Sequence, residues 1–196
     1  MVHMNKRSGA ASKERILRQA TKIFSEHGYE KSSMRMIAHA SNISIGGLYL
    51  YFKNKENLYL TLIKFMMNEY NNKLMKALLE IQDPVEKMRT YIAISLNYAK
   101  KHKELLLVKG REFGLSFGKD IKRNFFKSQK ELIEEIIERG VTSGVFSECR
   151  AKEVTKIIRS TIRGFIVSMI IEEDAIFSPE ECSNLILNGL MRREKQ

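Results

Sequence analysis

The stretch SNISIGGLYLYFKNK, residues 41–55, gathers side chains that suit contact with a polyanion. Serine and tyrosine hydroxyls donate hydrogen bonds to phosphate oxygens or base edges, and lysine ammonium groups neutralise phosphate charge. Gly46 and Gly47 leave a backbone free to approach a ligand closely, although each costs roughly 1 kcal/mol of helix propensity. The residue types therefore indicate recognition of nucleic acid.

The charge of the chain is concentrated at the same end. The 196 residues carry a net charge of +11, and residues 1–60 hold ten Lys/Arg against four Asp/Glu. The remaining residues hold 24 against 19 over more than twice the length. A basic surface of this kind favours a nucleic-acid partner, and an acidic membrane surface is the alternative.

The elements that must position these residues are helices. Only two prolines and eleven glycines interrupt the chain, and no alternation typical of strands is present, so we expect an all-α fold. Cap residues and helical periodicity predict the start and end of each element. The expected helices run from Ser12 to Gly28, from Ser33 past Ala38, from Ser44 through Phe52, from Asn54 to about residue 80, from Asp83, over 103–113, 119–139 and 151–174, and from Ser178.

Two short helices separated by a tight turn at residues 41–43 describe a helix-turn-helix. Leu48 and Phe52 lie four residues apart and are expected to face a small core with Ile23, Phe24 and Ile37. The second short helix would enter the DNA major groove, with Arg35 reaching a guanine edge and the lysines contacting phosphate. The predicted DNA-binding residues are Ser33, Arg35, Ser44, Ile45, Gly46, Gly47, Tyr49, Leu50, Tyr51, Lys53 and Lys55.

Residues 23–58 resemble the DNA-binding head of TetR-family transcriptional regulators. That family's pattern is approximately LF-x-x-x-G-(Y/F), then T-x-x-x-I-A, then A-G-V-S-x-G-x-L-Y-x-(H/Y)-F, then K-x-x-L. This chain matches the spacing of the pattern without a gap. Four positions depart from it: Ser41-Asn42 replaces Ala-Gly, Gly47 replaces Thr or Ser, and Leu50 replaces His or another polar residue. The matching residues are Phe24, Gly28, Tyr29, Ser33, Ile37, Ala38, Ile43, Ser44, Gly46, Leu48, Tyr49, Tyr51, Phe52, Lys55 and Leu58.

The resemblance implies a three-helix DNA-binding head followed by a larger helical body. We expect a disordered arm over 1–11, whose opening MVHM looks like a cloning remnant, a helix-turn-helix domain over 12–53, and an effector-binding and dimerisation domain over 54–196. The resemblance further implies a homodimeric repressor that leaves a pseudo-palindromic operator when a small hydrophobic effector binds. An effector-independent DNA-binding regulator is the alternative.

Residues of the body are assigned to an effector pocket and a dimer interface. Methionines and aromatic rings suit an adaptable apolar pocket, and a charged or titratable group would hold the polar end of a ligand. The predicted pocket residues are Met66, Tyr70, Tyr91, Tyr98, His102, Arg111, Phe113 and Phe126. Surplus apolar surface on the last two helices predicts an interface formed by Ile162, Phe165, Ile166, Met169, Leu185, Leu187 and Leu190.

Other chemistry has little support in the sequence. GLSFG, residues 114–118, matches the nucleophile elbow of esterases, which leaves a serine hydrolase using Ser116 as a remote alternative, but no strand precedes it. The four histidines have no metal-ligand spacing, so we expect no metal, no cofactor and no enzyme. Cys149 and Cys182 are expected to be free thiols of a cytoplasmic protein. The longest apolar stretch, residues 164–171, is too short to cross a bilayer.

Overall fold

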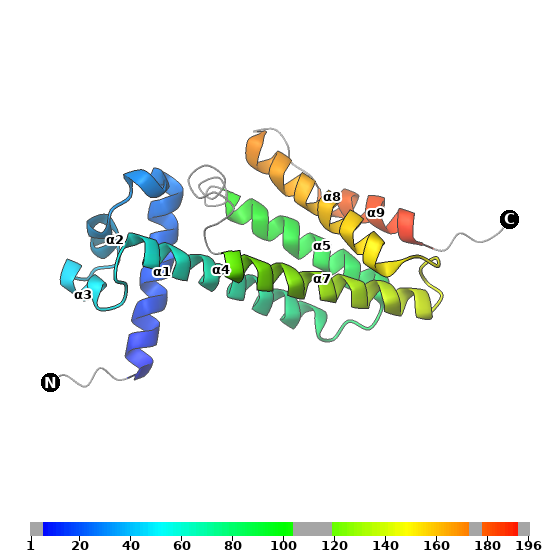
Figure 1. Ribbon diagram of the computed structural model, residues 1–196, viewed down its shortest axis with the longest axis horizontal. Coiled ribbons are helices and arrows are strands. Elements are labelled where there is room, and N and C mark those ends of the chain that lie inside the picture. Colours follow the sequence, from blue (N-terminus) through cyan, green and yellow to red (C-terminus); the bar gives the residue numbers. More distant parts are fainter. Residues whose placement is uncertain (1–5, 104–118, 173–177, 192–196) are drawn as a thin grey trace. The chain divides into compact units, whose positions relative to one another are not determined.

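The computed structural model describes residues 6–103, 119–172 and 178–191. Within these residues the chain is α-helical, with one isolated β-bridge between Phe146 and Met191, and the predicted all-α fold is confirmed (Figure 1). The helices are α1 (Lys6–Lys31), α2 (Met34–Ala40), α3 (Ile45–Tyr49), α4 (Lys55–Leu78), α5 (Pro84–Lys101), α7 (Lys119–Thr142), α8 (Ala151–Ile171) and α9 (Pro179–Leu190). The helix predicted over 103–113 lies almost wholly outside the described residues, as do Arg111, Phe113 and Ser116.

The chain forms two compact units, and each is described by itself. The N-terminal unit comprises the described residues up to Glu69, and the C-terminal unit comprises 70–103, 119–172 and 178–191. The division lies inside α4, sixteen residues beyond the boundary expected at residue 53. The functional domain limits drawn from the sequence stay a prediction.

The first helix begins earlier than expected. It starts at Lys6, so the arm predicted to be disordered over 1–11 is helical from residue 6 onward, and Ser12 is not its cap. Ala10 and Ala11 are strong helix formers, and a serine within a helix costs only a few tenths of a kcal/mol relative to alanine, roughly. Gly28 has φ 73°, which interrupts the helical backbone at the predicted stop.

The N-terminal unit holds the small core that the sequence predicts, except that Ile23 is only half-buried. Phe24, Ile37, Leu48 and Phe52 are almost completely buried, and α2 contacts both α1 and α3. Asn42 has φ 52°, the left-handed conformation that this turn requires and that asparagine tolerates. The recognition helix α3 ends at Tyr49 instead of Phe52, although the Phe52 amide still donates to the Leu48 carbonyl at 3.1 Å.

The C-terminal unit is a layered helical bundle centred on α5. This helix contacts α7, α8 and α9, and α7 also contacts α8 (Figure 1). Asp83 accepts hydrogen bonds from the Val85 and Glu86 amides, and Ser178 accepts one from the Glu181 amide, so both predicted caps are confirmed. None of the helices in the described part of the chain combines the length and apolar character needed to cross a membrane.

Candidate nucleic-acid interface and buried polar cluster

The helix-turn-helix is set by local hydrogen bonds of two serine caps. The Ser33 hydroxyl accepts a bond from the Met36 amide at 3.2 Å and begins α2. The Ser44 hydroxyl accepts one from the Gly47 amide at 3.0 Å and begins α3. Each cap satisfies a backbone donor that the first helical turn leaves without a partner. The two short helices are thereby fixed around the turn at 41–44.

The recognition helix α3 presents apolar side chains to solvent. Ile45 is 41% exposed, Tyr49 51% and Leu50, which follows the helix, 80%, whereas Leu48 on the opposite side is fully buried. A Cβ atom built on Gly46 would have no neighbour within 4 Å, and one on Gly47 would lie 3.2 Å from the Ser44 hydroxyl oxygen. The packing of the chain itself therefore gives no reason for a glycine at position 46.

Most of the predicted DNA-binding residues lie at the surface of this unit. Ser33, Arg35 and Lys53 are exposed, and Tyr51 is half-buried. These four residues and the exposed face of α3 supply hydroxyl groups, two positive charges and apolar surface. This set matches what a duplex presents, namely phosphates outside and base edges within the groove.

Lys55 has a different role from the phosphate contact expected of it. Its ammonium group donates hydrogen bonds to the carbonyl oxygens of Tyr29, Glu30 and Ser32 at 2.8, 3.3 and 3.1 Å. It also lies 4.2 Å from the centre of the Tyr29 ring, a cation–π geometry. Because an ammonium has three donors, all three are directed to the backbone, and Lys55 holds the start of α4 against the end of α1.

A buried polar cluster occupies the interior of the C-terminal unit. The hydroxyl oxygens of Tyr70 and Ser95 lie 2.7 Å apart, and the Tyr70 hydroxyl donates to the Gln129 side-chain carbonyl at 3.4 Å. The Gln129 amide group in turn donates to the Asn71 side-chain oxygen at 2.9 Å. Tyr70, Tyr91, Ser95 and Gln129 are all buried. Buried polar groups of this kind are hydrogen-bonded in native proteins, and here they are paired with one another.

Aromatic rings surround the cluster. The Tyr70 ring packs edge-on against Tyr98 and Phe125, with centroids 5.3 and 5.6 Å apart, and Tyr98 contacts the His102 ring at 4.4 Å. Phe126 is 41% exposed and has the guanidinium groups of Arg159 and Arg163 within 5.9 and 5.4 Å of its ring centre.

The structure thus brings together four of the predicted pocket residues, Tyr70, Tyr91, Tyr98 and His102. Met66 belongs to the N-terminal unit, and Phe126 lies at the surface. Ser95, Gln129 and Asn71 were missed, because nothing in their local sequence shows that they meet.

Burial changes the acidity of the cluster. Removal from water raises the pKa of Tyr70 far above its ordinary value, and the neighbouring Tyr91 charge adds to the shift. Burial also raises the pKa of the Tyr91 phenol, and hydrogen bonding to Ser95 and the positive charge of Arg159 oppose that shift. Both phenols therefore stay neutral hydrogen-bonding groups at physiological pH.

Part of the predicted dimer interface is wrong. Ile162, Met169, Leu187 and Leu190 are buried within the single chain, because α8 and α9 turn these side chains towards their own bundle. Leu185 is 65% exposed, and Phe165 and Ile166 are half-buried. Other apolar side chains of α8 are exposed, and the prediction missed them: Ile157, Val167 and Ile171.

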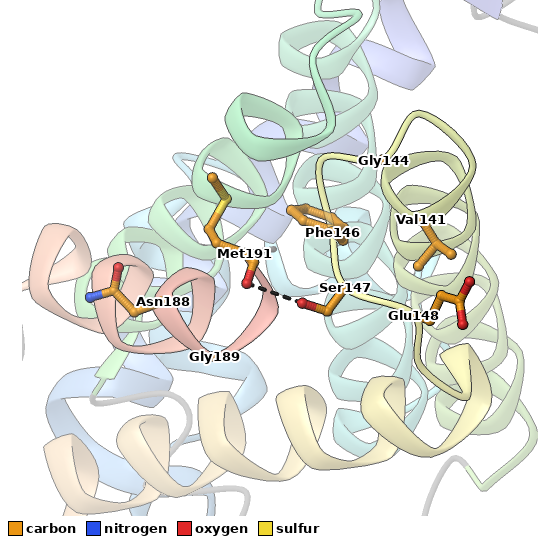
Figure 2. Close-up of a pocket in the computed structure, with 8 residues that line it drawn as sticks. All are labelled: Val141, Gly144, Phe146, Ser147, Glu148, Asn188, Gly189 and Met191. Carbon is orange, nitrogen blue, oxygen red and sulfur yellow. Dashed lines mark hydrogen bonds between the residues drawn. The ribbon is translucent and has the colours of Figure 1, made fainter. Parts of the chain in front are cut away.

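A pocket of about 510 Å³ lies at the end of α9, and none of the residues of the polar cluster lines it. Figure 2 shows Phe146, Ser147 and Met191 on its wall, where the Ser147 hydroxyl donates to the Met191 carbonyl at 3.1 Å. No predicted effector residue lines it. Its lining residues are Val141, Gly144, Phe146, Ser147, Glu148, Asn188, Gly189 and Met191.

A metal site would need a cluster of histidine, cysteine or acidic side chains. No group of three or more histidine, cysteine or acidic side chains within residues 6–103, 119–172 and 178–191 is placed to hold a metal ion. Cys149 is exposed and Cys182 buried, and both are free, as predicted.

The capped short helices define a helix-turn-helix protein, and comparison with known proteins gives its family. Residues 16–62 match the sequence model of the bacterial regulatory proteins of the tetR family. The N-terminal part of the chain therefore carries the helix-turn-helix head of the tetR family of transcriptional regulators.

A known relative agrees with this assignment, and solved structures share the fold. The uncharacterized HTH-type transcriptional regulator YhgD of Bacillus subtilis is 27% identical over 139 residues, which cover 70% of this chain and 73% of that protein. A TetR transcription regulator from Haloarcula marismortui has the same fold, with a TM-score of 0.82 at 16% identity over 93% of this chain and 100% of that one. The regulator FadR of Bacillus subtilis, solved with stearoyl-CoA, gives a TM-score of 0.74 at 22% identity over 89% of this chain and 95% of that one.

Proposed function

We propose that this regulator is a homodimeric repressor that binds a pseudo-palindromic DNA operator and leaves it when a small hydrophobic effector binds. The observation that carries the proposal is the exposed face of the helix-turn-helix. Ile45 and Tyr49 project from a capped helix, and Leu50 follows it, in the most basic part of the chain. Arg35 and Lys53 are exposed in the same unit. The DNA-binding set is the predicted one, with Lys55 reassigned to backbone contacts.

The dimer is supported by apolar surface that the single chain leaves uncovered. Ile157, Ile171 and Leu185 on α8 and α9 are each more than 60% exposed. Large apolar side chains exposed on the last two helices are typical of an interaction surface. Paired subunits would place two recognition helices about 34 Å apart, one helical turn of DNA, so the operator would have two-fold symmetry.

The effector site is assigned to the region of the buried polar cluster. Tyr70, Ser95 and Gln129 offer hydroxyl and amide groups to the polar part of a ligand, while Tyr98 and Phe125 offer apolar surface to the rest. The FadR structure with stearoyl-CoA supports an effector with a long apolar chain for this protein also. We place the protein in the cytoplasm, where its operator is.

Effector release follows from linkage. The helix α4 contains both Tyr70 of the cluster and Lys55, which is bonded to the end of α1. A ligand that displaces Tyr70 would therefore act on the helix that holds the helix-turn-helix in place. If effector binding lowers operator affinity by a given factor, DNA must lower effector affinity by the same factor.

The test starts with selection of binding sites from random duplexes by the purified protein. A two-fold-symmetric site whose affinity falls steeply with salt supports the regulator, and stearoyl-CoA is then titrated into the complex. Release by stearoyl-CoA that Tyr70→Leu abolishes supports the effector site. A symmetric site that no acyl-CoA affects would favour the effector-independent regulator, and failure to enrich any duplex after removal of copurified ligands would overturn the proposal.

A further inference from the structure

The recognition helix lacks the side chains that usually distinguish bases. Its sequence, IGGLY, contains no charged or amide side chain, and the residues that bound it are Ser44 and Leu50. The Ser44 hydroxyl accepts the cap hydrogen bond from Gly47. Only the Tyr49 hydroxyl is left on this helix as an uncommitted polar group, so hydrogen bonds from α3 to base edges are few.

Apolar surface takes the place of those polar groups. Ile45 and Tyr49 lie four residues apart and share one face of the helix, and Leu50 adjoins it at 80% exposure. Leu48 and Phe52, by contrast, are buried in the core of the unit. The exposed parts of Ile45 and Leu50 are therefore covered by nothing in the described chain.

The glycine at position 46 lies on the same exposed side. A Cβ here would meet nothing within 4 Å, so alanine would fit the protein and would favour the helix. A glycine at such a position allows close approach of an external surface. The base edges of the major groove are that surface if the head binds DNA.

On those edges one group is apolar. The C5-methyl of thymine projects into the major groove, whereas the other distinguishing groups there are hydrogen-bond donors or acceptors. We propose that Ile45 and Leu50 recognise thymine C5-methyl groups, so that α3 selects T·A pairs by apolar contact. This inference rests on the proposed operator binding. The positive charge for the surrounding phosphates comes from Arg35 and Lys53, which are exposed in the same unit.

The experiment uses the full-length protein and the operator obtained by selection. Each thymine is replaced in turn by deoxyuridine, which pairs identically but lacks the methyl group, and affinity is measured by fluorescence anisotropy at fixed salt. We expect about a fourfold loss at each contacted position, the factor that corresponds to burial of one methyl-sized group.

Variants then show which side chain makes each contact. Ile45→Ala and Leu50→Ala should bind weaker than the wild type and should each abolish the difference between thymine and deoxyuridine at one position. Leu79→Ala is the matched control, because Leu79 is 72% exposed and lies outside the helix-turn-helix. It should leave the difference at every position unchanged.

The outcomes separate this inference from the proposed function. If no duplex is enriched, both fail. If an operator is found but no deoxyuridine substitution changes its affinity, the operator function stands and the methyl contacts are refuted. A methyl effect that persists in both Ile45→Ala and Leu50→Ala would also refute the assignment, because other groups or the duplex shape would then be responsible.

Discussion

The recognition helix and the interior of the C-terminal unit break the usual distribution of side chains in opposite ways. Around α3, Ile45, Tyr49 and Leu50 are exposed, whereas Tyr70, Ser95 and Gln129 are buried in the bundle. Apolar exposure and polar burial each oppose stability unless something compensates. In the bundle the compensation is visible, since the polar groups bond to each other. Around α3 the described residues supply no such compensation, and we propose that operator DNA supplies it.

The largest expected effect is a difference in stability between alanine variants of Leu48 and Leu50, which lie two residues apart. Leu48→Ala removes a fully buried side chain and should lower the free energy of unfolding by about 2–5 kcal/mol. Leu50→Ala removes an exposed side chain and should change it by less than about 0.5 kcal/mol while weakening DNA binding. Urea unfolding and anisotropy measure the two effects. Equal destabilisation by both variants would show that Leu50 has a packing role.

The buried phenols should make the protein sensitive to alkali. Burial raises the pKa of Tyr70 and of Tyr91 in the folded state, whereas an unfolded tyrosine titrates near pH 10, approximately. Their contribution to stability is therefore complete below about pH 10. It is lost as the pH rises above that value, by at most about 1.4 kcal/mol per pH unit for each tyrosine.

The control for this effect is Tyr70→Phe. This variant lacks one of the two titrating phenols. Its free energy of unfolding, measured with urea between about pH 9 and 11, should therefore fall less steeply with pH than that of the wild type. This holds whatever the stability of the variant at neutral pH. An unchanged slope would mean that lysine deprotonation or another group causes the decline.

Variants of two lysines near the start of α4 should distinguish a structural role from a role in DNA binding. Lys55→Met removes three hydrogen bonds to the carbonyls of Tyr29, Glu30 and Ser32 and should cost about 1–2 kcal/mol of stability. Lys53→Met changes an exposed side chain and should leave stability nearly unchanged. It should weaken DNA binding and reduce the slope of log affinity against log salt by about 1. If Lys55→Met lowered that slope at unchanged stability, the phosphate contact first expected for Lys55 would be correct.

These residues also show what the sequence can and cannot predict. Caps such as Ser44 and Asp83 were predictable, because the hydroxyl or carboxylate bonds an amide two or three residues away. The contact of Lys55 with Tyr29 spans 26 residues, and that of Gln129 with Tyr70 spans 59, so neither leaves a local pattern.

Helical periodicity has a related limit. It identifies the apolar residues of α8 and α9, but it does not say which apolar face meets the chain's own core. Ile162 and Leu187 were therefore assigned to a partner although they are buried in the chain.

The smallest expected change in stability comes from Gly46→Ala, and this variant tests most directly whether DNA covers the exposed face of α3. Gly46→Ala should raise the free energy of unfolding by about 0.5–1 kcal/mol, because alanine favours the helix and its Cβ meets nothing within 4 Å. The same variant should bind the operator more weakly, since the added methyl projects from the face that approaches DNA. Gly47→Ala is the matched control, because its Cβ would crowd the Ser44 cap at 3.2 Å and offset the gain in helix propensity. Thermal unfolding with anisotropy on both variants decides the matter. A more stable Gly46→Ala protein with undiminished affinity would show that the duplex does not approach this face, and the compensation for the exposed side chains of α3 would have to be another partner.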